Sequence, residues 1–468
     1  MSQVSVVNSA RSIRQIVLAI AFGSICAVAS LYHWSVGPAL LLAACVAVAA
    51  ISQPMATWRV AVVVILLGTS YARPPFGSLL AWGILTVFLF GAWMERFAEG
   101  LAWQWGSRGL WLAILLWFGW IVAATYHSLY PPESAKEIER LGLSFVTLLI
   151  YLNWVTTGRQ LRQMIRWWEA VAVVIAGMGL LETAAQRFGL SWFHLIGPYP
   201  SNLDQLGPSF ATLIPLSVAL RLRGTVAARP ASFLAVAILA GGVWATASRA
   251  SCLAALVGSL VVLWHARPAW RRTITLSLVG LAIMGLLAAQ LKYHSLSTAV
   301  HHHLSGRDRV WTAALKATGE APWLGIGPGC WAGWFGRHYV SADFLLEDLK
   351  GNTFVLAPTL LGGEAHSLFL TKAAEGGWPS MLGLLAILAA WFVGVRSAWR
   401  QIPRGAPQAL VVGSWATMSG LVVLGLFEDG PIIGKARGQE ILLVWLVAAL
   451  PFLVARMARQ TGQDVGRA

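Results

Sequence analysis

The chain has 468 residues, of which 57% are apolar and only 11% are charged, whereas soluble domains carry about 25% charged residues. This composition excludes a soluble globular protein. The net charge of +15 does not indicate nucleic-acid binding, because the basic residues are spread between apolar runs and form no single basic face.

Apolar runs of about 15 to 20 residues recur along the chain, and runs of this length can cross a hydrocarbon core of about 30 Å. Short breaks that contain Arg, Pro or Gly separate them. We therefore predict an all-α, polytopic membrane helix bundle of roughly 12–14 transmembrane helices. The expected spans are 16–32, 36–51, 58–72, 78–94, 109–125, 141–157, 168–187, 208–222, 231–247, 250–265, 273–291, 366–395, 408–427 and 438–456.

The distribution of Arg and Lys between the breaks predicts the orientation of the chain. With a cytoplasmic N-terminus, twenty of the 34 basic residues lie in inside breaks and eight lie in short outside breaks. Cytoplasmic loops are enriched in Arg and Lys, so we expect both termini in the cytoplasm. Arg11, Arg14 and the apolar run after them also resemble a signal peptide, but the immediate second span favours an uncleaved anchor.

Residues 292–365 form an outside segment that is too long for a simple turn. We expect a helix at 306–318, followed by a glycine-rich turn at 322–329. Loops longer than about 15 residues are usually functional or disordered, and the many aromatic residues of this one indicate that it is folded. The predicted organisation is an N-terminal transmembrane bundle at 1–291, the external loop at 292–365, and C-terminal transmembrane helices with a cytoplasmic tail at 366–468.

Arg249 is the first candidate functional residue, at the external junction of two apolar runs. It lies in Thr246-Ala247-Ser248-Arg249-Ala250-Ser251, with no acidic residue nearby in sequence. A charge at membrane depth costs several kcal/mol unless it is paired or hydrated, which makes Arg249 a functional candidate. The alternative is an interfacial arginine whose side chain extends to the lipid headgroups.

Arg307 and Arg309 flank Asp308 in the external loop, in the run Ser305-Gly306-Arg307-Asp308-Arg309-Val310-Trp311. Arginine presents a planar fork that binds phosphate with two hydrogen bonds. The alternative is a local ion pair with the carboxylate. The sequence leaves both possibilities open.

His366 lies where the polar loop ends and an apolar helix begins, in Glu364-Ala365-His366-Ser367. An imidazole, with an ordinary pKa of about 6.5, can accept a proton at neutral pH. The alternative is an interfacial or capping histidine. Glu364, His366 and Glu375 do not have the spacing of a metal site, so we expect no metal.

Taken in order, these motifs resemble the O-antigen ligase and polymerase superfamily, whose members have many spans and a large late periplasmic loop. The resemblance is strongest over 240–395. One departure is His-Ser at 366–367, where His-Asn is commoner in the family. The matching motifs are Ser248-Arg249, Ser305-Gly306-Arg307 with Trp311, Pro322 to Gly327, His366-Ser367 with Phe369-Leu370, and Glu375-Gly376.

The resemblance implies an inverting glycosyltransferase that needs no metal, nucleotide sugar or other cofactor. The donor would be a glycan on undecaprenyl pyrophosphate, and the acceptor a sugar hydroxyl on lipid A-core or another glycan. Arg249 and Arg307, with Arg309 as second choice, would bind the pyrophosphate, and His366 would be the general base. The implied location is the bacterial inner membrane, in contact with membrane lipids.

Two other functions remain open from the sequence. A polymerase of lipid-linked repeat units would use the same motifs. A flippase of lipid-linked glycans would also have many spans, but transporters of that kind show related halves and broken helices near the midplane, and neither is visible here. The long asymmetric loop therefore favours an enzyme.

Overall fold

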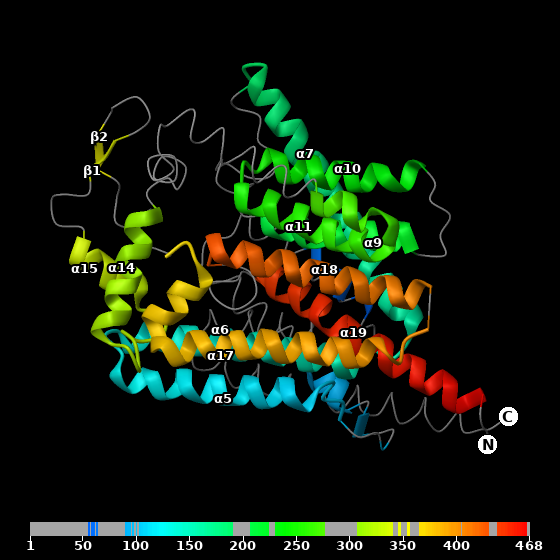
Figure 1. Ribbon diagram of the computed structural model, residues 1–468, viewed down its shortest axis with the longest axis horizontal. Coiled ribbons are helices and arrows are strands. Elements are labelled where there is room, and N and C mark those ends of the chain that lie inside the picture. Colours follow the sequence, from blue (N-terminus) through cyan, green and yellow to red (C-terminus); the bar gives the residue numbers. More distant parts are fainter. Residues whose placement is uncertain are drawn as a thin grey trace, which may run out of the picture.

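The computed structural model describes residues 55–56, 58–60, 62–63, 89–94, 96–97, 100, 103–190, 206–223, 230–276, 307–339, 345–347, 353–355, 365–403, 405–429 and 438–465. In these ranges the protein is almost entirely helical, and its long helices run side by side (Figure 1). Six of the described helices are long and apolar enough to cross a membrane. The prediction of an all-α polytopic membrane protein is confirmed.

Nine described helices coincide with predicted spans. The spans expected at 16–32, 36–51, 58–72, 78–94 and 273–291 lie wholly or largely outside the described residues, so the total number of spans stays a prediction. The nine helices are α5 (Arg108–Ala124), α6 (Pro131–Trp154), α7 (Gly158–Arg187), α9 (Gly207–Arg223), α10 (Pro230–Ala245), α11 (Arg249–Ala266), α17 (Leu368–Trp399), α18 (Ala406–Phe427) and α19 (Gly438–Val465).

The described part of the external loop contains two helices and a small hairpin. Helix α14 (Arg307–Glu320) confirms the helix expected at 306–318, and α15 (Trp331–Tyr339) follows the glycine-rich turn. Strands β1 (Leu345–Glu347) and β2 (Thr353–Val355) pair antiparallel, a feature that we did not predict. Two short 3-10 helices, η1 (Thr125–His127) and η2 (Pro268–Trp270), complete the described elements.

Helices α9, α11 and α18 pack closely because small residues face each other. A Cβ atom added to Gly258 of α11 would lie 2.4 Å from the Pro215 ring of α9. One added to Gly420 of α18 would lie 2.4 Å from the Ala254 carbonyl oxygen of α11. Small residues let membrane helices approach until their backbones touch, and here they hold together the helices whose ends carry the candidate site.

Helix α17 is interrupted at Gly377, whose backbone has φ 73° and ψ 178°. Pro379 has no N–H, so the carbonyl of Glu375 lacks its helical donor. The backbone N–H of Gly327, in the external loop, donates to that carbonyl at 3.0 Å. The span predicted at 366–395 is therefore present as a single apolar helix, long enough to cross a membrane, with a kink at Gly377 that the sequence analysis did not predict.

The glycine-rich turn predicted at 322–329 is present and docks on this break. The N–H of Ile326 donates to the Ala374 carbonyl at 2.9 Å, and the N–H of Trp378 donates to the Pro322 carbonyl at 2.9 Å. Gly325 has a positive φ of 65°, and a Cβ there would lie 2.4 Å from the backbone of α17. Only glycine allows so close an approach at such a dihedral angle.

The path of α17 leads to a prediction about topology. This helix carries the chain from the loop to the opposite end of the bundle, where the described arginines include Arg271, Arg396, Arg456 and Arg459. Reporter fusions within 307–339 should give an external signal, and fusions within 396–407 a cytoplasmic one. A cytoplasmic signal from a fusion at residue 330 would contradict both the orientation and any external site.

Candidate functional site

Four segments that are far apart in sequence meet at one end of the bundle. They are the turn between α10 and α11, the start of α14, the start of α17 and the end of α18 (Figure 1). The hydroxyl of Ser248 donates to Oε1 of Glu428 at 3.3 Å. The indole N–H of Trp311 donates to the His366 carbonyl at 3.4 Å. These contacts bring the predicted residues Arg249, Arg307 and His366 to one region.

The charges in this region are coupled. Partial burial lowers the pKa of Arg307, the carboxylate of Glu428 raises it, and the guanidinium of Arg249 lowers it. Two positive groups therefore lie within electrostatic range of each other, with one carboxylate near them. Arginine stays protonated under all such conditions, so the site keeps its positive charge. Guanidinium groups held in this way can bind an anion such as a phosphate.

Arg249 is placed by a tight turn between two helices. Ala247 has a positive φ of 53°, and Ser248 caps α11 by accepting a hydrogen bond from the N–H of Ser251 at 3.2 Å. The close fit of α9 fixes this turn further, because a Cβ on Gly207 would lie 2.9 Å from the Ser251 hydroxyl. The Arg249 side chain is exposed at the N-terminal end of α11. The helix dipole adds positive potential at this end.

His366 is held in a conformation that few residues adopt. Its φ is 50°, in the left-handed region, and its side chain is half-buried. The backbone N–H groups on both sides of it, those of Ala365 and Ser367, donate to the buried carboxylate of Asp429 at 3.3 and 3.2 Å. The hydroxyl of Thr371 donates to the same carboxylate. Asp429, which follows the end of α18, thus binds the backbone on both sides of His366 and fixes its orientation just before α17 begins.

Two residues of the site, Glu428 and Asp429, were missed by the sequence analysis. They follow the last turn of α18, and the only signal for them was a pair of carboxylates at the external end of an apolar run. The side chains of Asp308 and Arg309 lie outside the described residues, as does Glu364. The second-choice role of Arg309 therefore stays a prediction.

A buried ion cluster lies beside this region. Nζ of Lys372 is 2.6 Å from Oε1 of Glu137 and 3.4 Å from Oε2 of Glu375, and these three side chains are only 2–3% exposed. The other carboxylate oxygen of Glu375 accepts from the N–H of Trp331 at 3.4 Å. The cluster thereby joins α6, α17 and the external loop.

Groups of three or more His, Cys, Asp or Glu side chains that could hold a metal do not occur in the described ranges. That the reaction needs no metal stays a prediction.

Comparisons with known proteins show what the chain is similar to. Residues 234–385 match the family described as O-antigen ligase. The O-antigen ligase of Pseudomonas aeruginosa is 25% identical over 240 residues, which cover 50% of this chain and 51% of that protein. The match thus spans about half the length of that curated relative.

One solved structure also aligns with the chain. It is described as "Structural coordination of polymerization and crosslinking by a peptidoglycan synthase complex", and the alignment covers 77% of this chain and 99% of that one. The TM-score is 0.44 and the sequence identity is 16%, so this likeness carries no argument about function.

Proposed function

We propose that the chain is a glycosyltransferase of the O-antigen ligase superfamily, whose model matches residues 234–385, and that it uses a lipid-linked donor at the outer face of the bacterial inner membrane. The donor is a glycan on undecaprenyl pyrophosphate, and the acceptor is a sugar hydroxyl on lipid A-core or on another glycan. The observation that carries the proposal is that the starts of α11, α14 and α17 meet at one end of the bundle, where Ser248 contacts Glu428 and Trp311 contacts the His366 carbonyl.

In the proposed reaction the acceptor oxygen attacks the anomeric carbon of the donor sugar. The bond from that carbon to the pyrophosphate oxygen breaks, and the electron pair leaves with the undecaprenyl pyrophosphate. Arg249 and Arg307 stabilise the negative charge that develops on the leaving group. His366 takes the proton of the acceptor hydroxyl as general base. A single displacement of this kind inverts the configuration at the anomeric carbon.

Glu428 has a positioning role in this proposal. Its carboxylate accepts from Ser248, next to Arg249, and acts on Arg307 as an opposing charge. Before the donor binds, it limits the repulsion between the two guanidinium groups. A polymerase of lipid-linked repeats would use the same donor chemistry, so this site is compatible with either acceptor. The proposal keeps the predicted division into a transmembrane bundle at 1–291, a loop at 292–365 and C-terminal helices at 366–468.

The phosphate role of the two arginines predicts a selective loss of activity. Arg249→Lys and Arg307→Lys keep the charge but remove the planar fork, so transfer should fall by about 10²–10³-fold at each position. Turnover per folded molecule is measured with purified protein, a lipid-linked donor and a glycan acceptor.

Arg337→Lys is the matched control for both variants. Arg337 is also an external arginine, but its guanidinium stacks on the Tyr130 ring at 4.6 Å from the ring centre. Its replacement should leave turnover within about twofold of the wild type, since it has no part in phosphate binding. Full activity in both site variants would remove Arg249 and Arg307 from the donor site.

A further inference from the structure

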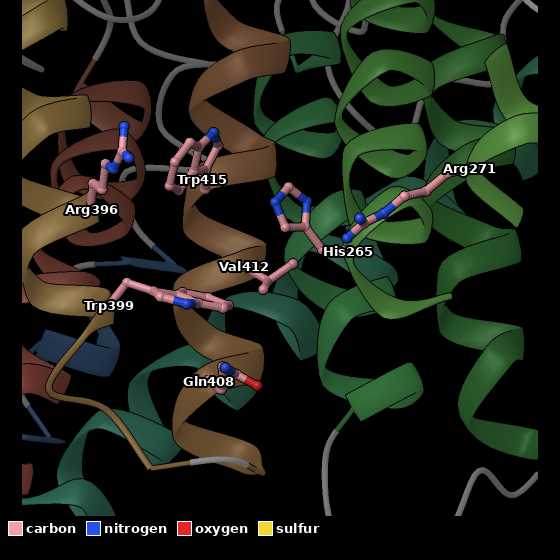
Figure 2. Close-up of a pocket in the computed structure, with 7 residues that line it drawn as sticks. All are labelled: His265, Arg271, Arg396, Trp399, Gln408, Val412 and Trp415. Atoms are coloured by element: carbon pink, nitrogen blue, oxygen red, sulfur yellow. The ribbon is translucent and has the colours of Figure 1, made fainter. Parts of the chain in front are cut away.

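A cavity lies at the end of the bundle opposite the candidate site. Its volume is about 520 Å³, and it opens between α17, α18 and the C-terminal end of α11 (Figure 2). Arg249 begins α11 and His265 lies near its end, so about 24 Å of helix separates the two regions. This cavity is therefore distinct from the donor site, and the predicted topology places it at the cytoplasmic leaflet.

Two arginines face this cavity from different helices. Arg396 comes from α17, and Arg271 follows η2, where its Nε donates to the Trp264 carbonyl at 3.0 Å. Figure 2 shows the Arg271 guanidinium directed toward His265. Among the described residues, neither Arg271 nor Arg396 forms an ion pair with a carboxylate. The cavity thus has positive charge on two sides, and an anion would balance it.

The walls of the cavity are aromatic and apolar. The Trp415 ring lies between His265 and Phe392, with ring centres 6.0 and 5.8 Å away. Figure 2 shows the indole of Trp399 extending toward Val412. Indole rings are typical of the membrane interface, where an apolar body meets polar headgroups. A free inorganic anion would gain nothing from these walls.

We propose that this cavity binds the headgroup of an anionic glycerophospholipid from the cytoplasmic leaflet. The phosphate would interact with Arg271 beside His265, and Arg396, on the other side of Trp415, would add positive charge to the cavity. The glycerol backbone and the start of the acyl chains would pack on Trp399 and Trp415. An amphiphile matches both features, the cationic groups and the indole walls. The inner leaflet supplies such lipids, and basic pockets between membrane helices are known to hold their headgroups.

Native mass spectrometry of the purified full chain tests this proposal. The probes are phosphatidylglycerol, phosphatidylcholine with the same acyl chains, and inorganic phosphate. The wild type should retain phosphatidylglycerol in preference to phosphatidylcholine, and Arg271→Gln/Arg396→Gln should bind it roughly tenfold more weakly or worse. The control Arg159→Gln/Arg162→Gln removes the same charge from exposed arginines at the start of α7 and should bind like the wild type.

Three outcomes would overturn the proposal. Equal retention of both lipids would show that the anionic headgroup is not recognised. Equal weakening in the two double variants would mean that only the overall charge matters. Inorganic phosphate that competes as well as the lipid would mean that the site holds a free anion. Unchanged thermal unfolding without lipid shows that a double variant is folded, and Arg271→Lys/Arg396→Lys, which keeps the charge, should restore most of the binding.

Discussion

His366→Asn is expected to lower glycan transfer by about 10²–10⁴-fold, because the amide cannot act as general base. Asparagine suits this test because it adopts left-handed backbone angles more readily than most residues. His366 has a φ of 50°, so the replacement should leave the local backbone intact. The measurement is turnover per folded molecule with purified protein, lipid-linked donor and acceptor.

A purely structural role for His366 predicts the opposite pattern. In that case His366→Asn would reduce thermal stability or yield, and the folded fraction would transfer at the normal rate. His366→Gly separates the two further, because glycine removes the strain of the positive φ and also lacks a base. Normal turnover in folded Asn and Gly variants would mean that His366 takes no part in proton transfer.

The helices were predictable because their signal is local. A run of apolar residues predicts a helix over the same residues, and Ser248 at the start of such a run predicts an N-cap. The kink in α17 could not be predicted in this way. Gly377 and Pro379 mark a possible interruption, but what makes it stable is the N–H of Gly327 in a distant turn. No pattern within one segment contains that partner.

The residues of the candidate site also differ in whether local sequence predicts them. Arg249, Arg307 and His366 were predictable, because each is an ionisable residue beside an apolar run or within a motif. Glu428 and Asp429 were not, because their roles depend on which helix ends meet. The side chain of Ser367 makes no capping hydrogen bond, and the N–H of Leu368 in the first turn of α17 donates to the Glu428 carbonyl at 3.2 Å. A partner so distant in sequence becomes visible only in three dimensions.

Lys372→Met is expected to destabilise the protein by roughly 3–5 kcal/mol, because it removes the buried cation beside Glu375 and leaves Glu137 with only the more distant Arg140, at 3.6 Å, among the described residues. The loss should also loosen the external loop, since the Glu375 side chain accepts from the N–H of Trp331. Thermal unfolding in detergent measures the stability. Limited proteolysis of the loop reports its loosening.

The surface pair Lys136–Glu133 provides a matched control for this prediction. Its N–O distance is 2.6 Å, the same as that of Lys372–Glu137, but its side chains are 57% and 50% exposed while those of the buried pair are 2% and 3% exposed. Lys136→Met should therefore cost less than about 1 kcal/mol, because water screens the remaining charge. Adding Glu137→Gln and Glu375→Gln to Lys372→Met should recover much of the lost stability, since the unpaired buried charges are then gone. Equal, small losses for Lys372→Met and Lys136→Met would show that the buried cluster does not hold α6, α17 and the external loop together.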